Sequence, residues 1–128
     1  MVPNDKDYER LLAFRTTLRR FDQWSRHAAA ANGLTHTQHQ LLLAVRGHPG
    51  AEDPTVGEVA EYLLVKHHTA SELADRVEAL GLLRRVRDRV DHRVVRLQLT
   101  DSGHRVLAKL TEVHLEELER LSPLLGRH

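Results

Sequence analysis

The chain has 128 residues, 41% of them apolar, and a net charge of +1, which is enough for one domain with its own core and does not by itself indicate a polyanionic partner. The absence of cysteine excludes disulfide frameworks, thiolate-ligated zinc and cysteine-based redox sensing. Charged residues occur throughout residues 1–30, so neither a signal peptide nor a membrane span is expected, and we predict a soluble cytoplasmic protein.

The first predicted element is a helix over residues 5–31. Its apolar residues recur every three or four positions, with further apolar residues widening the stripe: Leu11, Phe14, Leu18, Phe21 and Ala28, then Tyr8, Leu12 and Trp24. Asn32 and Gly33 supply a helix end. At 1.5 Å per residue this helix is about 40 Å long, more than a small globule needs. We therefore expect part of it to pack against a second subunit.

Two capping-box patterns predict the starts of the next two helices. Thr35 with Gln38 precedes the apolar run 41–45, and Thr55 with Glu58 precedes a second, shorter run. A loop rich in Gly and Pro, residues 47–54, separates them. The inward positions predicted for the shorter helix are Val56, Val59, Ala60, Leu63 and Leu64.

A further short helix is predicted over residues 67–80, a few residues after the preceding one. Its apolar stripe is Ala70, Leu73, Val77 and Leu80, and its opposite face is largely polar. Gly81 ends it. Two short helices in close succession are typical of a helix-turn-helix.

The segment that follows is predicted to form an arginine-rich β-hairpin over residues 83–99. Its second half alternates strictly between apolar and polar residues. Residues 84–96 contain six Arg and two Asp, a net charge of +4, which leaves the remainder of the chain at −3. Thr100 is then the predicted N-cap of a last amphipathic helix over residues 101–122, which stops near Pro123.

This order of elements predicts a mainly α fold with a small β-hairpin, namely a winged helix-turn-helix flanked by helices at both ends. Within this single domain we expect residues 35–99 to form the DNA-binding core, and the helices 5–31 and 101–122 to form a homodimer. The polar face of the second short helix suits a major groove, and the hairpin, or wing, suits the flanking phosphates. The residues predicted to face DNA are Lys66, His67, His68, Thr69, Ser71, Glu72, Arg76, Arg84, Arg85, Arg87, Arg89 and Arg93.

Several segments resemble the MarR family of transcriptional regulators, in the family's order and near its spacings. They are Leu34-Thr35 with Gln38, TVGEVAEYL at 55–63, ASELADRVEALGLLRR at 70–85, Asp91-His92-Arg93, and LTDSG at 99–103. The resemblance implies a dimeric repressor or activator of transcription that binds a palindromic operator in double-stranded DNA and responds to a small-molecule effector. It also implies that Ser71 faces bases, that Arg93 reaches the minor groove and that Asp91 shapes the wing.

The sequence departs from the family pattern in two places. Glu72 stands where relatives often have a basic or polar residue, and only six residues follow Ser122, so we expect a shortened final dimerisation helix. Glu72 either selects a cytosine amino group or pairs with Arg76 at i+4, and we favour the pairing because a carboxylate near phosphates is costly. Asp91 is expected to orient Arg93 or Arg89 rather than to touch DNA.

Other functions find weaker support. Five histidines lie on predicted helices and could converge on a metal ion: His27, His36, His39, His104 and His114. Only His36 and His39, at i and i+3, have a spacing that could place two ligands on one helix face. We therefore predict neither a metal nor a cofactor. Tyr8, Phe21 and Trp24 could line an effector cleft, although such residues on a long helix are more often core. No phosphate-binding loop or nucleophile motif indicates an enzyme. A helical interaction or anti-repressor module without specific DNA binding remains the alternative.

Overall fold

Helices form most of the computed structural model, which describes residues 1–125. The elements are α1 Asp5–Ala31, α2 His36–Gly47, α3 Val56–Leu63, α4 His67–Ala79, β1 Leu83–Arg87, β2 Val95–Leu99, α5 Asp101–Leu121 and the 3-10 helix η1 Ser122–Leu125. The predicted fold class, mainly α with a β-hairpin wing, is confirmed. In residues 1–125, no helix has both the length and the apolar character that crossing a bilayer requires. Part of the segment after Ser122, where we expected a shortened helix, lies outside the described residues.

The predicted caps begin their helices through short side-chain to backbone hydrogen bonds. Thr35 and Thr55 each accept a hydrogen bond from the backbone N–H three residues on, and Gln38 and Glu58 accept one from the N–H of the capping threonine. Thr100 caps α5 in the same way through the N–H of Gly103. These bonds fix where each helix starts.

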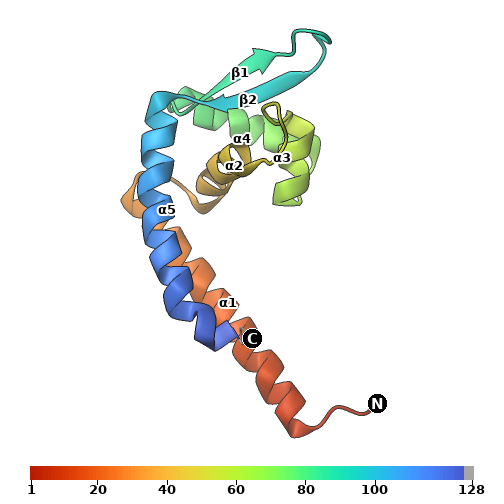
Figure 1. The fold of residues 1–128 in the computed structure, drawn as a ribbon, viewed down its shortest axis with the longest axis vertical. Coiled ribbons are helices and arrows are strands. Elements are labelled where there is room, and N and C mark those ends of the chain that lie inside the picture. The colour runs from red at the N-terminus through yellow and green to blue at the C-terminus, as the bar shows by residue number, and fades with distance from the viewer. Residues whose placement is uncertain (126–128) are drawn as a thin grey trace.

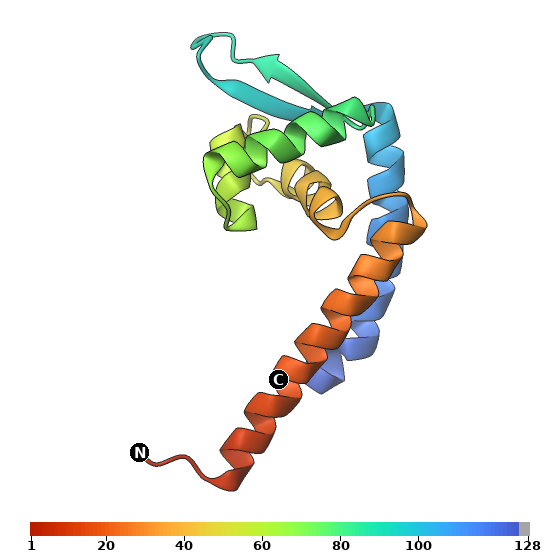
Figure 2. The same ribbon diagram turned by 180° about the vertical axis from the view of Figure 1, so that it is seen from behind.

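The molecule has two parts that differ in shape. Helices α1 and α5 lie side by side as a stalk, and α2, α3, α4 and the hairpin form the winged helix at one end of it (Figures 1 and 2). The N-terminal half of α1 continues beyond the end of α5, so this half has no neighbouring element in the described chain (Figure 1). The two strands pair antiparallel, with Leu83 opposite Leu99 and Arg87 opposite Val95.

Most of the core lies inside the winged helix, and Ala29 of α1 with Leu107 and Leu110 of α5 extend it to the stalk. Leu41 and Leu42 of α2, Val59 of α3, Val77 of α4 and Leu97 of β2 have no solvent exposure. Burying a Leu or Val side chain contributes about 1.5–3 kcal/mol each, so these positions hold the three helices against the base of the hairpin. The wing is therefore attached to the helix-turn-helix through apolar contacts at Leu83, Leu97 and Leu99.

Two of the predicted inward positions are wrong. Leu64 is 91% exposed because it caps α3 in the left-handed conformation, with φ of 57°, and so leaves the apolar stripe. Leu80 is 51% exposed because α4 ends at Ala79 and the chain turns at Gly81, whose φ is +77°. Both errors fall at helix ends, where the helical period no longer sets the direction of the side chain.

A cluster of aromatic rings, made of Phe21, Trp24, His39 and His114, joins α1, α2 and α5. Phe21 stacks on Trp24 at 6.0 Å, and Trp24 meets His114 edge to face at 4.8 Å. The Ser25 hydroxyl lies 2.7 Å from Nε2 of His114, and Nδ1 of His114 lies 2.7 Å from the Leu110 carbonyl oxygen. Because a carbonyl only accepts, Nδ1 of His114 carries a proton and donates to Leu110.

Of the aromatic residues considered as an effector cleft, only Phe21 and Trp24 contact each other. Both are half-buried in the ring cluster, whereas Tyr8 is 61% exposed near the start of α1. The three therefore do not converge, and the expectation that Phe21 and Trp24 are packing residues agrees with their contacts.

Candidate nucleic-acid interface

The N-terminal turn of α4 presents exposed polar side chains. Lys66 is the N-cap residue and makes no side-chain capping bond, and His67, His68 and Thr69 follow as exposed residues in the first turn. The buried side of the same helix is formed by Ala70, Ala74 and Val77. One face of α4 thus packs against the core, and the residues predicted to contact DNA are exposed on the other face.

The predicted residues of α4 border two separate hollows. His67 and Ser71 line a groove of about 350 Å³ between α4 and the wing, together with Arg85 and Arg93. Thr69, Glu72 and Arg76 instead line a cavity of about 380 Å³ against α2. In residues 1–125 no ion pair joins Glu72 to Arg76, so the favoured pairing at i+4 is absent from the structure.

Arg85 links the wing to α4. Its Nη2 donates to the backbone carbonyl of Ser71 at 2.8 Å and to Asp75 Oδ1 at 2.7 Å, and it lies 3.2 Å from the Ser71 hydroxyl oxygen. The guanidinium also lies 3.9 Å from Glu78. Arg85 shares its face of the hairpin with buried Leu83 and lies opposite Leu97, which explains why it turns towards α4.

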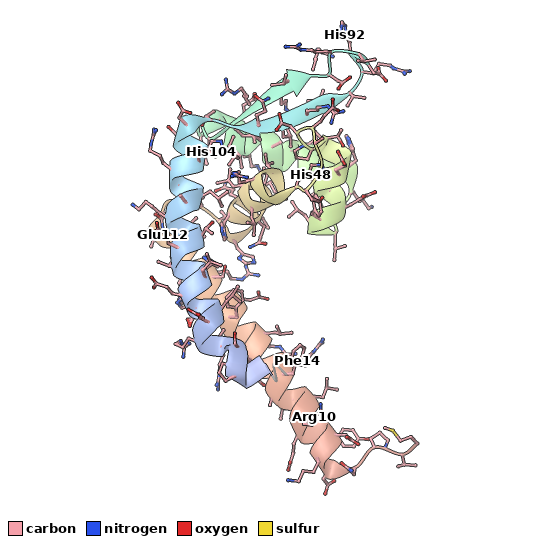
Figure 3. The ribbon with its side chains drawn as sticks, viewed as in Figure 1. Arg10, Phe14, His48, His92, His104 and Glu112 are labelled. Carbon is pink, nitrogen blue, oxygen red and sulfur yellow. The ribbon has the colours of Figure 1, made fainter. Side chains whose placement is uncertain are left out.

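The tip of the wing is held by local hydrogen bonds. Asp91 accepts from the backbone N–H of Arg93 at 3.1 Å and from its Nε at 3.0 Å, and this interaction lowers the pKa of Asp91 and raises that of Arg93. The Arg93 side chain remains 90% exposed. Arg87 donates to the carbonyl oxygen of His92 at 2.8 Å, and His92 lies at the far end of the hairpin (Figure 3). The geometry agrees with the expectation that Asp91 orients Arg93.

Sequence reasoning missed the anchor of the wing, which is Arg96. Its guanidinium donates to Asp88 Oδ1 at 2.8 Å and to the Asp53 carbonyl at 2.7 Å, and it pairs with Glu52 at 2.8 Å. The backbone N–H of Asp91 and the Arg96 side chain hold the pKa of Asp88 at about 2. Since Asp53 lies 43 residues away in sequence, no local spacing could have indicated this contact.

The remaining wing arginines are available for an external partner. Arg84 and Arg89 are exposed, and within residues 1–125 neither takes part in an ion pair. Together with the exposed Arg93, they give the wing a cationic outer surface beside α4. Guanidinium groups placed this way match the phosphates of nucleic acid better than a compact ammonium does.

The histidines considered as metal ligands separate into distinct places. His36, His39 and His114 lie near one another, and the rings of His39 and His114 are 4.6 Å apart. His27 is exposed on α1, and His104 lies on α5 beside the loop that contains His48 (Figure 3). In the described residues, no group of three or more His, Asp or Glu side chains is placed to hold a metal ion.

The fold and the cationic surface beside α4 define a winged helix-turn-helix protein, and comparison with known proteins places it more closely. A family model described as "MarR family" matches residues 32–94. The chain is 37% identical over 79 residues to the HTH-type transcriptional regulator PecS of Dickeya dadantii, covering 61% of this chain and 46% of PecS. It is 32% identical over 108 residues to the HTH-type transcriptional regulator TtmR of Methylorubrum extorquens, covering 84% and 54%. The chain spans about half the length of these two relatives.

The solved structures agree on the fold. The crystal structure of the S. aureus MepR–DNA complex superposes with a TM-score of 0.76 at 24% identity, covering 89% of this chain and 82% of MepR. Residues 32–94, which contain α2, α3, α4 and β1, match the model of the MarR family, and the resemblance found in the sequence is confirmed.

Proposed function

We propose that this chain is a transcriptional regulator that binds double-stranded DNA sequence-specifically as a homodimer. The observation that carries the proposal is the juxtaposition of the exposed first turn of α4 with a wing whose arginines are held in place beside it. In this arrangement α4 would enter the major groove while Arg93 and its exposed neighbours meet the flanking phosphates or the minor groove. The naming of the relatives as transcriptional regulators supports the same role.

A second surface supports the homodimer. The N-terminal half of α1 exposes large apolar side chains, with Tyr8 at 61%, Leu11 at 60%, Leu12 at 65% and Phe14 at 44%, and Phe14 lies where α1 extends past α5 (Figure 3). Helix α5 also exposes Leu115 at 60%. Exposed apolar side chains in this number usually mark an interface, and twofold pairing of identical chains would cover them.

A small-molecule effector is the finer part of the proposal. The hollows on either side of α4 support it, because a ligand in either one would contact residues that are predicted to face DNA. Such a ligand would compete with DNA or shift α4, and its affinity for the free protein would exceed that for the DNA complex.

Selection of bound fragments from a random duplex library tests DNA binding directly. The full chain should enrich a motif made of two inverted half-sites, and binding should weaken steeply with salt because phosphate contacts release counterions. Enrichment of no motif, together with equal affinity for random duplexes, would overturn the proposed function. A double variant that removes the exposed wing charges, Arg89→Ala with Arg93→Ala, is the matched loss-of-binding control.

A further inference from the structure

Ser71 occupies a distinctive position on α4 because its hydroxyl lies against a charged group from the wing. The Nη2 of Arg85 is 3.2 Å from Ser71 Oγ and 2.8 Å from the Ser71 carbonyl oxygen. Ser71 also lines the groove between α4 and the wing, so its hydroxyl is accessible from the side where DNA would lie. The inference below rests on the proposed DNA binding.

The contact with Arg85 restricts what the hydroxyl can do. A guanidinium N–H can only donate, so the Ser71 oxygen is the acceptor in this interaction. The positive charge beside the oxygen also directs the O–H dipole away from Arg85, because the hydroxyl hydrogen carries partial positive charge. Within residues 1–125 the Ser71 hydroxyl donates to no acceptor, so its hydrogen is unused.

Asp75 keeps Arg85 in this orientation. Its Oδ1 accepts from the same Nη2 at 2.7 Å, and Glu78 lies 3.9 Å from the Arg85 Nε. The backbone carbonyl of Ser71 provides a further fixed acceptor. Three of the contacts are thus set by α4 itself, which holds the guanidinium beside the Ser71 side chain before any partner binds.

We propose that Ser71 reads DNA as a hydrogen-bond donor and that Arg85 is the positioning residue that enforces this direction. The base contacted by Ser71 then presents a major-groove acceptor, which is N7 of a purine, O6 of guanine or O4 of thymine. The amino groups of adenine and cytosine are donors, and they are disfavoured because Arg85 already donates to the Ser71 oxygen and its charge repels a further donor hydrogen. Without Arg85 the serine hydroxyl would accept or donate equally well, and this selectivity would weaken.

The test uses base analogues that delete one groove atom at a time in one half-site of the selected duplex. The acceptor deletions are 7-deazaguanine, 7-deazaadenine, 2-aminopurine for guanine and 5-methylpyrimidin-2-one for thymine. The amino deletions are purine for adenine and pyrimidin-2-one for cytosine. Each duplex is titrated with the full chain and with Ser71→Ala, so that effects of the analogue on DNA pairing cancel between the two proteins.

The expected result is that one acceptor deletion weakens binding of the unmodified protein about two- to tenfold, the range for a single neutral hydrogen bond, and leaves Ser71→Ala unchanged. A loss that depends on Ser71 but appears with an amino deletion would overturn the inference. The inference would also be overturned if every deletion affected the unmodified protein and Ser71→Ala equally. Failure of the unmodified protein to enrich any motif would instead overturn the proposed function, and this inference with it.

Arg85→Met supplies the second arm, with Arg84→Met as the matched control because Arg84 is the exposed neighbour on the opposite face of β1. Both variants lose one positive charge per chain. Arg85→Met should reduce the sensitivity to the critical acceptor deletion at least twofold, whereas Arg84→Met should lower affinity without changing that sensitivity. Equal sensitivity in all three proteins would show that Arg85 does not set the direction of the Ser71 bond. The analogue titrations use the unmodified protein, so they remain decisive if Arg85→Met fails to fold.

Discussion

The winged helix and the stalk bury their apolar side chains to different degrees. In the winged helix, Leu41, Leu42 and Leu97 have no exposure, and the most exposed large apolar residues are Leu64 at the cap of α3 and Val90 near the tip of the wing. In the stalk, α1 has five exposed large apolar residues, which are Tyr8, Leu11, Leu12, Phe14 and Leu18. The first part holds most of the core, which Ala29, Leu107 and Leu110 of the stalk complete, and its wing presents charge, whereas the N-terminal half of α1 presents apolar surface. The two proposed partners follow this difference, with a polyanion for one part and a second copy of the chain for the other.

The largest expected effect comes from making the stalk polar. Leu11→Asp combined with Phe14→Asp places two charges per chain where α1 is expected to meet its partner, so the dimer should dissociate. Because tight binding requires one dimer to occupy both half-sites, affinity for the selected duplex should fall more than about 100-fold. Light scattering and anisotropy titration measure the two effects.

The control for this double variant is Leu64→Asp, which alters a more exposed apolar residue at the turn of the helix-turn-helix. Leu64 already has a positive φ, a conformation that Asp tolerates. This control should remain dimeric. A double variant that also stays dimeric at micromolar concentration would contradict the role given to α1.

The next effect concerns the charge of the wing. Arg93→Ala should weaken specific and non-specific duplexes together by about tenfold. The slope of log affinity against log salt should decrease by about one for each phosphate that a subunit of the variant no longer neutralises. Lys109→Ala on α5 removes an equal charge from the stalk and should leave the salt slope unchanged. If Arg93→Ala altered only the preferred sequence and not the salt slope, Arg93 would be a reader of bases.

A smaller effect is expected at Glu72. Because Glu72 is exposed on α4 and forms no ion pair with Arg76 in the described chain, its charge would face phosphate repulsion in a complex. Glu72→Gln should therefore strengthen non-specific binding by a few-fold, measured at low salt. If the variant instead relaxes base preference and leaves non-specific affinity unchanged, Glu72 selects a base.

The last effect is on stability and arises in the ring cluster that joins α1, α2 and α5. His39 is buried, its Nδ1 has no hydrogen-bond partner, and burial together with His114 and His36 lowers its pKa to about 4. The folded state then favours neutral His39, so its contribution is fully present above pH 6.5 and is lost as the pH falls towards 4. At pH 5 this single group should reduce the free energy of unfolding by about 2 kcal/mol relative to pH 7.5.

Urea unfolding at both pH values and at one protein concentration measures this decrease. His39→Leu should show a smaller difference between the two pH values, although His36 retains part of it because burial also lowers its pKa. His92→Gln, at the exposed wing tip, should unfold like the unmodified protein. An unchanged pH dependence in His39→Leu would show that His39 does not control it.

Periodicity and capping patterns predicted most of the fold, because both act over a few residues. The threonine caps start α2, α3 and α5 where the sequence indicated, and α1 has the predicted bounds. Leu64 and Leu80 were wrong because a left-handed cap and a turn redirect the chain at helix ends. The pattern of apolar residues contains no information about these local changes.

The candidate site was only partly predictable. Arg85 shares its strand face with Leu83, so the alternation of the strand contained a signal that it turns inwards, but its contacts with Ser71 and Asp75 depend on how the wing packs against α4. The anchor at Arg96 depends on residues 52 and 53, and no sequence spacing connects them to the wing. Long-range ion pairs of this kind follow from the fold and cannot be inferred before it.

In the proposed complex, two copies of the chain read two half-sites through two α4 helices. The most direct measurement is the mass of the complex on the selected duplex, combined with titration of a duplex carrying five extra base pairs between the half-sites. We expect two chains per duplex and a fall to non-specific affinity on insertion, because the half-sites then rotate by about half a helical turn. One chain per duplex, or binding that is insensitive to the insertion, would show that the chain does not bind DNA in this way.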